Sequence, residues 1–450
     1  MPDICRMNQI LLFGAGKSAT VLIKYLVANA SKEGWNLTVA DANLEMAREK
    51  LNNSPFGKAV SFDITDDTKR RSFISNADIV ISMLPPSLHG KVARDCLQFS
   101  KHLLTASYVD DEMRSMKNEI ADRQVLFLCE MGLDPGIDHM SAMMLIDRLR
   151  AKGGKIVSFK SHCGGLVAPE SDDNPWHYKI SWNPRNIVMA GKAGAVYKMN
   201  GKIIEQPYET LFDTNGMVSI PQLGTLQYYP NRDSLSYISL YSLESTVTFL
   251  RTTLRDPDFC KGWKYIIKIG LTDESPNSHL LEKECSFREW LDKSVASRTT
   301  ATNFEGFLAT IVDDKERTLV KQMFGYLGLF DNKIIPGYAK SSADVLQFAM
   351  ENKLSLQAND KDMIVMLHQF EYDLDGRREI INTCLVVKGD DRVNTAMAKT
   401  VGLPLGIATK LVLNGTIQSR GLRIPVSKDI YEPVLSELEQ YDIKFNEETS

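Results

Sequence analysis

Short apolar runs alternate with longer amphipathic segments through the first third of the chain. Six apolar runs end where polar residues or glycines begin, at residues 9–13, 37–41, 58–64, 77–84, 102–108 and 124–133. The segments between them, such as TVLIKYLVANA at 20–30, place apolar residues at helical spacing. Strands that alternate with helices in this way predict an α/β fold with a doubly wound, parallel sheet of the Rossmann type.

The first predicted strand runs directly into GAGKSA, residues 14–19. Gly14 can take a tight turn, Gly16 lets a backbone approach a pyrophosphate, and Ala19 permits close packing of helix and sheet. The N–H groups at the start of the next helix would face the phosphates. With a strand before it and a helix after it, the motif predicts a dinucleotide-binding domain.

The second predicted strand ends at Asp41, about 25 residues after Gly16. A carboxylate at this spacing accepts hydrogen bonds from the ribose diol and would repel a 2′-phosphate. Asp41 therefore predicts a preference for NAD(H), with NADP(H) as the alternative cofactor. A structural explanation also exists, because Asp41 could begin the turn that leads into the helix starting near Asn43.

Ligands of a doubly wound sheet bind at the carboxyl ends of its strands. We therefore expect cofactor contacts from the glycine loop and the strand ends, namely Gly14, Gly16, Lys17, Ser18, Ala19, Asp41, Asp63, Ile64, Met83, Leu84, Ala106 and Ser107. Asp63 has an equally good structural explanation, because an aspartate there can cap the helix that follows.

Beyond the sixth apolar run the pattern changes to mixed strands, helices and loops. Asn200-Gly201 and Asp375-Gly376 are typical of β-hairpin turns. The aromatic and polar stretch at 226–241 predicts a loop that lines a site. Residues 153–170 read as a strand that runs into a glycine loop at Gly164-Gly165, and residues 245–263 read as a strand that ends in a turn. Three domains are expected: a dinucleotide-binding domain at 1–134 that 392–450 could complete, an α+β domain at 135–263 and 356–391, and a small, mainly helical domain at 264–355.

Composition narrows the class of protein further. The 450 residues are too many for one ordinary core, and the net charge of -4 excludes a general attraction to nucleic acid or anionic membranes. Seven cysteines without a CxxC pair argue against a zinc site or a disulfide framework, so we expect no metal and a reducing compartment. The N-terminal apolar run is too short for a signal peptide, and no run approaches the roughly 18 apolar residues of a membrane span. We expect a cytoplasmic protein.

The stretch CEMGLDPGIDH, residues 129–139, concentrates polar and conformationally special residues at a strand-to-helix corner. Its glycines and proline can bring backbone amides close to a ligand. Asp134 could bind an ammonium group or relay a proton, or it could cap the following helix. Asp138 is the better candidate for the cap because it lies nearer the helix start, and His139 is expected to have a structural role.

Motifs spread over nearly the whole chain make it similar to a known family. They are GAGKSA, ISMLPPSLH, TASYVDDEM, EMGLDPGIDHMSA, SHCGGLVAPESDDNPWHYKISW, YPNRDS, AMAKTVGLPLGIA and LNGTIQSRG. In this order they resemble the L-glutamate-forming saccharopine dehydrogenases, also called saccharopine reductases. The resemblance implies reversible, pyridine-nucleotide-dependent oxidation of L-saccharopine to 2-aminoadipate semialdehyde and L-glutamate in lysine metabolism. It also implies a homodimer, with substrate binding and dimerisation in the α+β domain.

The resemblance implies roles for individual residues as well. It places Ser107, Tyr108, Asp134, Arg232, Arg251, Thr252 and Thr253 at the substrate, adds Leu133, Asp134 and Pro135 to the cofactor contacts, and puts Asp134, Tyr108 and Cys163 near the reacting carbon. The guanidinium fork of Arg232 suits a carboxylate. The two threonines could equally belong to a strand interior, and Cys163 could be a small buried residue.

Two other functions compete with this one. A related architecture could couple an amino-acid semialdehyde to a polyamine, as carboxynorspermidine synthase does, but Arg232 speaks against a cationic amine at that position. The chain could also be an NAD-binding sensor without turnover. The joint presence of Tyr108, Asp134 and Arg232 argues against a sensor.

Overall fold

The computed structural model describes residues 6–213, 216–277 and 284–449. Contacts within the chain divide it into two compact units. Unit 1 comprises residues 1–155, 374–377 and 385–446, and unit 2 comprises residues 156–373, 378–384 and 447–450. The three-domain division expected from the sequence remains a prediction.

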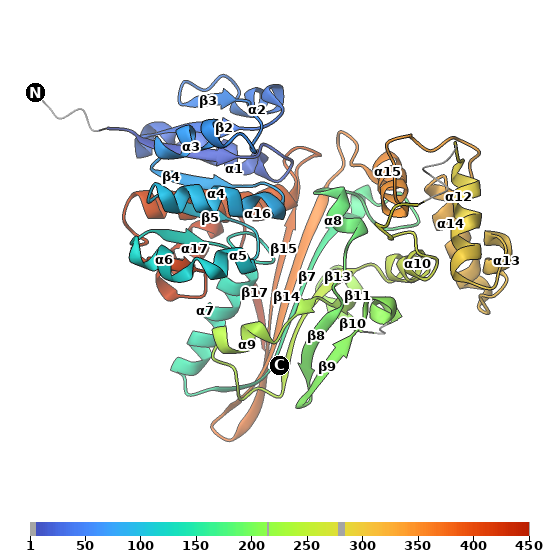
Figure 1. The fold of residues 1–450 in the computed structure, drawn as a ribbon. Coiled ribbons are helices and arrows are strands. Elements are labelled where there is room, and N and C mark those ends of the chain that lie inside the picture. Colours follow the sequence, from blue (N-terminus) through green and yellow to red (C-terminus); the bar gives the residue numbers. More distant parts are fainter. Residues whose placement is uncertain (1–5, 214–215, 278–283, 450) are drawn as a thin grey trace, which may run out of the picture. The chain divides into compact units, whose positions relative to one another are not determined.

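Unit 1 is built on a parallel seven-stranded sheet with the strand order β16-β6-β5-β4-β1-β2-β3 (Figure 1). Its elements are β1 (Asn8–Phe13), α1 (Ala19–Glu33), β2 (Trp35–Ala40), α2 (Leu44–Leu51), β3 (Gly57–Val60), α3 (Asp67–Ser75), β4 (Ile79–Ser82), α4 (Pro86–Gln98), β5 (His102–Thr105), α5 (Asp111–Ser115), α6 (Lys117–Asp122), β6 (Leu126–Leu128), α7 (Ile137–Ala151), α16 (Ala396–Leu413), β16 (Gly421–Arg423) and α17 (Lys428–Leu438). The strand order reverses beside β1, which lies between β2 and β4, and ligands of doubly wound sheets bind at this switch point. The predicted Rossmann-type sheet is confirmed.

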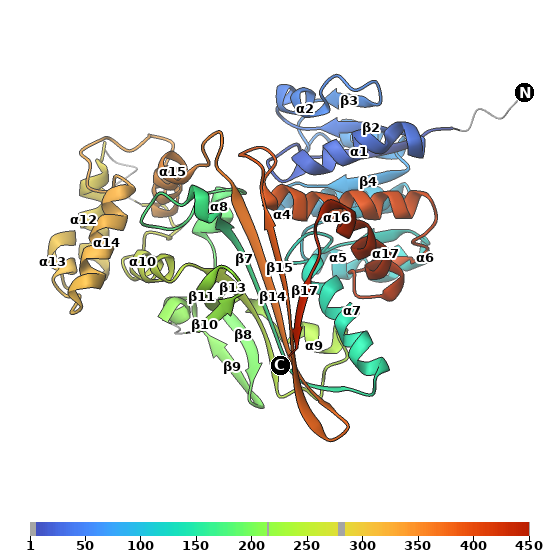
Figure 2. The same ribbon diagram turned by 180° about the vertical axis from the view of Figure 1, so that it is seen from behind.

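Helices cover both faces of this sheet, with α3 and α4 on one face and α1 and α16 on the other (Figures 1 and 2). Helix α16 is long and apolar enough to cross a membrane, but 72% of it is buried inside the structure. It packs tightly on α1, because a Cβ atom at Gly402 would lie 2.7 Å from Leu22 N and one at Gly406 would lie 2.5 Å from Tyr25 Cδ1. The apolar surface of α16 is thus that of a core helix.

Unit 2 is built on a mixed ten-stranded sheet, whose path is β10-β11-β13-β7-β14-β15-β17. Strand β8 pairs with β13, β9 and β12 outside this path. The elements are β7 (Lys155–Val167), α8 (Pro184–Val188), β8 (Ala195–Met199), β9 (Lys202–Gln206), β10 (Met217–Ile220), β11 (Gly224–Pro230), β12 (Arg232–Asp233), α9 (Ser236–Leu240), β13 (Thr248–Arg255), α10 (Pro257–Lys268), α12 (Phe287–Arg298), α13 (Phe304–Leu308), α14 (Asp314–Tyr326), α15 (Ser342–Leu354), β14 (Asp362–Leu374), β15 (Arg377–Lys388) and β17 (Asn446–Thr449). Both predicted hairpins are present, as β8–β9 and β14–β15.

Three segments of unit 2 are more regular than the sequence predicts. Residues 226–241 are not one loop, because they contain most of β11, then β12 and α9. Strand β7 continues through Gly164, where a Cβ atom would lie 2.7 Å from Leu254 Cβ of the neighbouring strand β13. The expected turn after β13 is helix α10, which begins with Pro257 behind the N-cap Asp256.

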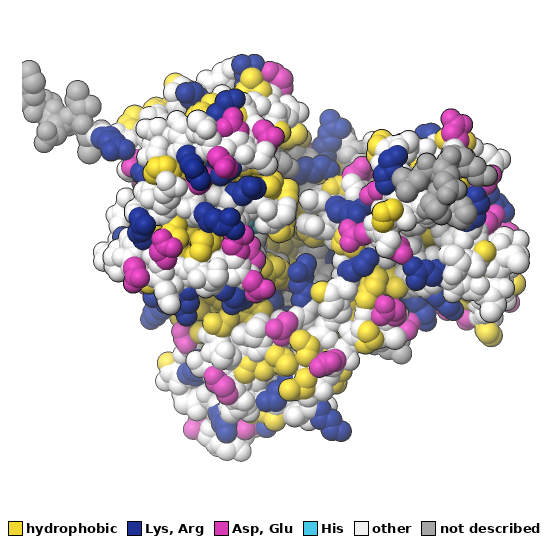
Figure 3. Space-filling view, in the orientation of Figure 1, with side chains coloured by type: hydrophobic (Ala, Val, Ile, Leu, Met, Phe, Trp, Pro, Cys, Tyr) yellow, Lys and Arg dark blue, Asp and Glu magenta, His cyan; other side chains and the backbone are white. Residues whose placement is uncertain are grey.

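Positive and negative side chains are interspersed on the face shown in Figure 3. Among the described residues visible in this view, no large patch of a single sign stands out. This mixture agrees with the near-neutral net charge of -4.

Candidate functional site

The glycine loop of unit 1 has the geometry that the sequence predicts for a phosphate cradle. Gly14 has φ +97°, and a Cβ atom there would lie 2.8 Å from Met83 O, so only glycine fits. Above Gly16 nothing lies within 4 Å of an added Cβ atom, which leaves open space in front of the loop. Lys17 is exposed, Ser18 is the N-cap of α1, and Ala19 is buried. The loop therefore fits a dinucleotide pyrophosphate at the start of α1.

Asp41, directly after β2, is tied into this loop. Its Oδ2 accepts a hydrogen bond from Ala15 N at 2.6 Å, and its Oδ1 accepts one from Asn43 N at 2.8 Å. Asn43 caps α2 by accepting a hydrogen bond from Met46 N. A cation that sequence reasoning missed lies at the same loop, because Lys50 Nζ donates a hydrogen bond to Gly16 O at 2.5 Å. Asp41 thus holds the glycine loop to the turn after β2.

The other candidate cofactor residues lie after β3, β4 and β5. Asp63 does not cap α3, whose N-cap is Asp66; it accepts hydrogen bonds from Thr65 N and Oγ1 instead. Ile64 O accepts a hydrogen bond from the buried side chain of Arg70. The three remaining candidates each have a protein contact. Met83 N donates a hydrogen bond to Phe13 O, Leu84 packs on the apolar core, and Ala106 faces Gly132.

A buried histidine that the sequence analysis did not single out links two strand ends. His89 Nδ1 lies 2.7 Å from Ser82 Oγ, and His89 Nε2 lies 2.8 Å from Ser107 Oγ. Burial lowers the pKa of His89 to about 4, against the opposing effect of Asp110, so the imidazole is neutral at pH 7. A neutral imidazole donates with one nitrogen and accepts with the other, and so it can fix the orientation of the Ser107 hydroxyl.

The corner at 129–139 contains a buried polar network. His139 Nε2 lies 2.9 Å from Glu130 Oε2, and His139 Nδ1 lies 3.7 Å from Asp138 Oδ2. Glu130 Oε1 accepts a hydrogen bond from Val109 N, and Asp138 Oδ1 accepts one from Gly136 N. Asp138 lies inside α7 and not at its N-cap, which is Gly136. The network joins the end of β5 to the start of α7.

This network supports the turn that presents Asp134. The side chain of Asp134 is half-buried, whereas Leu133 and Pro135 are buried. The turn is closed by hydrogen bonds from Gly132 N to Pro135 O and from Ile137 N to Gly132 O. Tyr108 is half-buried after β5.

In unit 2, one face of β13 carries two of the candidate substrate residues. Because side chains alternate along a strand, Arg251 and Thr253 share a face, and Thr253 is in register with Cys163 of β7. Thr252 points to the opposite face, where its Oγ1 lies 2.7 Å from Nδ1 of buried His162. The structure therefore groups Arg251, Thr253 and Cys163 and separates Thr252 from them.

Arg232 lies on β12, which pairs with β8. It is exposed on β12 with φ +50°, and the preceding residue, Asn231, donates a hydrogen bond to Arg251 O at 2.8 Å. Ser234 Oγ accepts a hydrogen bond from Arg251 N, and the Arg251 guanidinium lies 4.4 Å from the centre of the Tyr237 ring.

Sequence reasoning missed Arg255, the most unusual cation of unit 2. It follows Thr253 on the same face of β13 and is only 4% exposed. Its Nη1 donates to Leu254 O at 2.7 Å, its Nε has no hydrogen-bond partner, and no carboxylate of the described residues forms an ion pair with it. Burial would lower the pKa of Arg255, but the nearby Tyr229 and Tyr178 hydroxyls and the thiols of Cys260 and Cys163 raise it, so the group stays charged.

Burying an unpaired guanidinium group costs free energy unless an anion binds to it. The guanidinium lies 5.3 Å from the centre of the Tyr178 ring and 5.5 Å from that of Phe259, so aromatic faces supply part of its solvation. The half-buried side chain of Thr253 leaves this face of β13 partly open between Arg251 and Arg255. The signal in the sequence was the spacing of the two arginines in RTTLR, which places both on one face of a strand.

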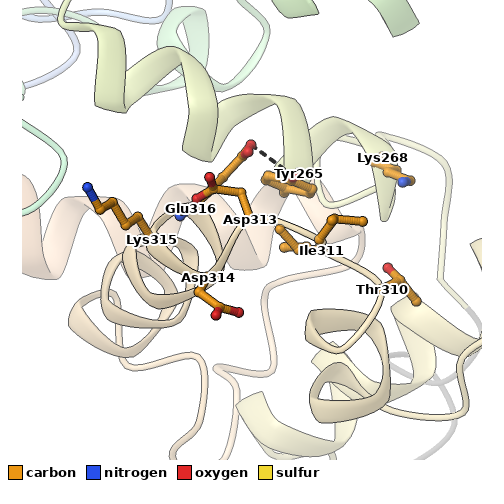
Figure 4. A pocket seen from close by; sticks show the side chains of 9 residues that line it. Tyr265, Lys268, Thr310, Ile311, Asp313, Asp314, Lys315 and Glu316 are labelled. Carbon is orange, nitrogen blue, oxygen red and sulfur yellow. Dashed lines mark hydrogen bonds between the residues drawn. The ribbon is translucent and has the colours of Figure 1, made fainter.

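An open pocket of about 740 Å³ lies elsewhere in unit 2, among the helices (Figure 4). Tyr265, Lys268 and the segment 310–316 line it, and Tyr265 donates a hydrogen bond to Glu316 Oε1 at 2.9 Å. None of the residues predicted for the cofactor or the substrate lines this pocket. It is separate from the candidate site.

Three potential metal ligands, His177, Asp256 and Asp258, place their ligand atoms within 4.8 Å of one another. Each already has a protein partner. His177 Nδ1 lies 2.6 Å from Asp172 Oδ2, Asp256 caps α10, and Asp258 pairs with Lys261 at 2.8 Å. Their arrangement is explained by these contacts.

The glycine loop forms a phosphate cradle at the switch point of a Rossmann-type sheet, and one face of β13 carries arginines. Together these features place the molecule among the dinucleotide-dependent oxidoreductases. The chain belongs to the saccharopine dehydrogenase family. Residues 10–128 match the family model of the saccharopine dehydrogenase NADP binding domain, and residues 132–443 match that of the saccharopine dehydrogenase C-terminal domain.

Individual relatives match over nearly the full chain. The saccharopine dehydrogenase (NADP(+), L-glutamate-forming) of Saccharomyces cerevisiae is 35% identical, over 98% of this chain and 99% of the relative. The solved apo saccharopine dehydrogenase (L-Glu forming) from S. cerevisiae has a TM-score of 0.88 at 34% identity and covers 98% of this chain and 100% of that chain. The alpha-aminoadipic semialdehyde synthase of Arabidopsis thaliana is 34% identical over 99% of this chain, which spans 45% of that longer protein.

The expected preference for NAD is wrong. The matching family model is that of an NADP binding domain, and the relatives from S. cerevisiae and Schizosaccharomyces pombe are named as NADP(+) enzymes. The structure supplies a physical reason. Both carboxylate oxygens of Asp41 accept backbone hydrogen bonds, and Lys50 at the same loop supplies a positive charge. The expectation from the sequence took account of the carboxylate of Asp41 alone, without the lysine that the fold places at the same loop.

Proposed function

We propose that this protein oxidises L-saccharopine to 2-aminoadipate semialdehyde and L-glutamate, reversibly, with NADP+ as the oxidant. The observation that carries the proposal is the likeness to the S. cerevisiae enzyme of that specificity over 99% of its length. One saccharopine, one NADP+ and one water give one semialdehyde, one glutamate, one NADPH and one proton. When bound, the nicotinamide accepts the hydride from the carbon next to the secondary amine.

The chain's own residues bind and orient the substrate in this proposal. Saccharopine has three carboxylates and a primary ammonium group. Arg232, Arg251 and Arg255 supply guanidinium groups for carboxylates, which they can bind through two parallel hydrogen bonds. Asp134 either holds the ammonium group or relays the proton that leaves when water splits the imine. Ser107 and Tyr108 offer hydroxyl groups to the substrate, and His89 holds the hydroxyl of Ser107.

A spectrophotometric assay tests the proposal. Purified protein is incubated with L-saccharopine and either NADP+ or NAD+, and reduced nicotinamide and released glutamate are both measured. We expect equal amounts of NADPH and glutamate, and a higher kcat/KM with NADP+ than with NAD+. Nicotinamide reduction without glutamate would contradict the proposed substrate. Absence of turnover would direct the same assay, in the reductive direction, to a semialdehyde with a polyamine, and then to the non-catalytic sensor.

We also propose that the protein is a homodimer that associates through the face of β15 that carries Ile380. The family resemblance motivates this proposal, and Ile380 supports it: the side chain is 40% exposed and lies on the same face of β15 as the core residue Cys384. In sedimentation velocity we expect twice the chain mass of 50.6 kDa. Ile380→Lys should yield monomers, whereas Ile203→Lys, at a 64% exposed isoleucine of β9, should not. A monomeric parent protein would refute the proposal.

We further propose a cytoplasmic location. The proposal is supported by the cysteines, since the six in the described part of the chain are free and buried.

A further inference from the structure

Lys50 occupies an unusual place for a lysine in a surface helix. It lies in the last turn of α2, and its side chain is half-buried and turned back to the glycine loop, where Nζ donates to Gly16 O at 2.5 Å. Arg48 of the same turn is exposed and pairs with Glu45 at 2.7 Å. Lys50 therefore places a cation at the loop, while its basic neighbour points to solvent.

The charge of Lys50 is incompletely solvated. Burial lowers the pKa of its ammonium group to about 8, although the facing carboxylates of Asp41 and Glu49 act in the opposite direction. The carboxylate of Asp41 shares its negative charge between the lysine and the backbone N–H groups of Ala15 and Asn43, to which its two oxygens are hydrogen-bonded. A further anion at this position would restore the favourable interactions that the ammonium group loses on burial.

The position of this cation relative to the sheet points to its ligand. In doubly wound dinucleotide-binding sheets, the adenosine ribose lies at the carboxyl end of the second strand, beside the glycine loop. Lys50 and Asp41 are together at that end of β2, and a phosphate on the 2′-oxygen would extend from the same ribose. Lysine is a frequent partner of phosphate, for which it acts as a point charge.

We propose that Lys50 binds the 2′-phosphate of the dinucleotide and thereby selects NADP(H), with Asp41 acting as a structural tie of the loop. The inference rests on the proposed function for the identity of the cofactor. It assigns the choice between the two dinucleotides to a residue of α2 rather than to the end of β2.

Two small probes test this inference without any turnover. Adenosine 2′,5′-bisphosphate carries the 2′-phosphate, adenosine 5′-monophosphate lacks it, and both dissociation constants can be measured by isothermal titration calorimetry. In Lys50→Met we expect on the order of 10-fold weaker binding of the bisphosphate, because a hydrogen bond between charged groups is lost. Binding of the monophosphate should change less than about 2-fold. Lys32→Met, which removes an exposed lysine from the far end of α1, should change neither constant.

The pH dependence gives an independent readout. Protonated Lys50 attracts the phosphate, so the affinity of the parent protein for the bisphosphate should fall as pH rises from 7 to 9, through the pKa of about 8. The second pKa of a phosphate, about 6, lies below this window and does not contribute. In Lys50→Met the ratio of the two affinities should no longer depend on pH over this range.

Three results would overturn the inference: weaker binding of the bisphosphate than of the monophosphate by the parent protein, equal losses for both probes in Lys50→Met, or no loss for either. Equal losses would mean that Lys50 only supports the glycine loop. These results are independent of saccharopine turnover. If the probes behave as expected but saccharopine is not oxidised, the phosphate site stands and the proposed function fails.

Discussion

Replacing Arg255 by methionine is expected to raise the KM for saccharopine about 100-fold or more, while the affinity for NADP+ changes less than about 2-fold. Removing one partner of a buried charge pair costs roughly 2–5 kcal/mol of binding, and each 1.4 kcal/mol corresponds to a factor of about ten. Methionine retains the apolar stem that packs near Tyr178 and Phe259. Steady-state kinetics and a dinucleotide titration would measure the two effects.

The stability of the same variant separates a binding role from a structural one. Because Arg255 has no carboxylate partner in the described part of the chain, Arg255→Met should leave the free energy of unfolding in urea unchanged or raise it. Arg185 provides a matched control in unit 2, since it forms ion pairs with Glu274 and Asp344 at the surface. Arg185→Met should leave the KM unchanged. A large loss of stability in Arg255→Met with an unchanged KM would show that Arg255 is structural.

The strands and turns of unit 1 could be predicted well from the sequence, for a physical reason. Its central strands are buried on both faces and therefore read as continuous apolar runs, as β1 and β4 do. In unit 2 the glycines after Cys163 suggested a loop, whereas Gly164 lies inside a strand because β13 approaches too closely for a side chain. Helix α10 was missed although its signals were present, with Asp256 as N-cap and Pro257 in the first turn.

The sequence predicts the site less well than the fold, because the site depends on the direction in which each side chain points. Strand alternation, once the register is known, brings Thr253 and Cys163 together and turns Thr252 away. The sequence alone does not reveal that Lys50 folds back from the end of α2 to the glycine loop, or that Arg255 has no partner. The assignment of Asp41 to NAD failed for the same reason, since its hydrogen bonds depend on groups that only the fold brings to it.

Replacing Gly16 by valine is expected to weaken dinucleotide binding about 100-fold or more, which corresponds to roughly 3 kcal/mol, without unfolding the protein. Nothing lies within 4 Å of a Cβ atom built on Gly16, so the first side-chain atom of the valine meets no neighbour in the absence of ligand. In the complex its methyl groups would occupy the space that the pyrophosphate needs close to the backbone. Fluorescence titration with NADPH and the urea midpoint would measure the two quantities.

Variants at Gly14 and Gly337 serve as controls, which show whether the weaker binding in Gly16→Val comes from a clash with the dinucleotide. Gly14→Ala should destabilise the fold itself, because Gly14 has φ +97° and its added Cβ atom would lie 2.8 Å from Met83 O. Gly337 also has nothing within 4 Å of an added Cβ atom, but it lies in unit 2, so Gly337→Val should change neither binding nor stability. Normal NADPH affinity in Gly16→Val would mean that the pyrophosphate lies away from the glycine loop. A lowered urea midpoint in that variant would instead show that Gly16, like Gly14, is required by the fold.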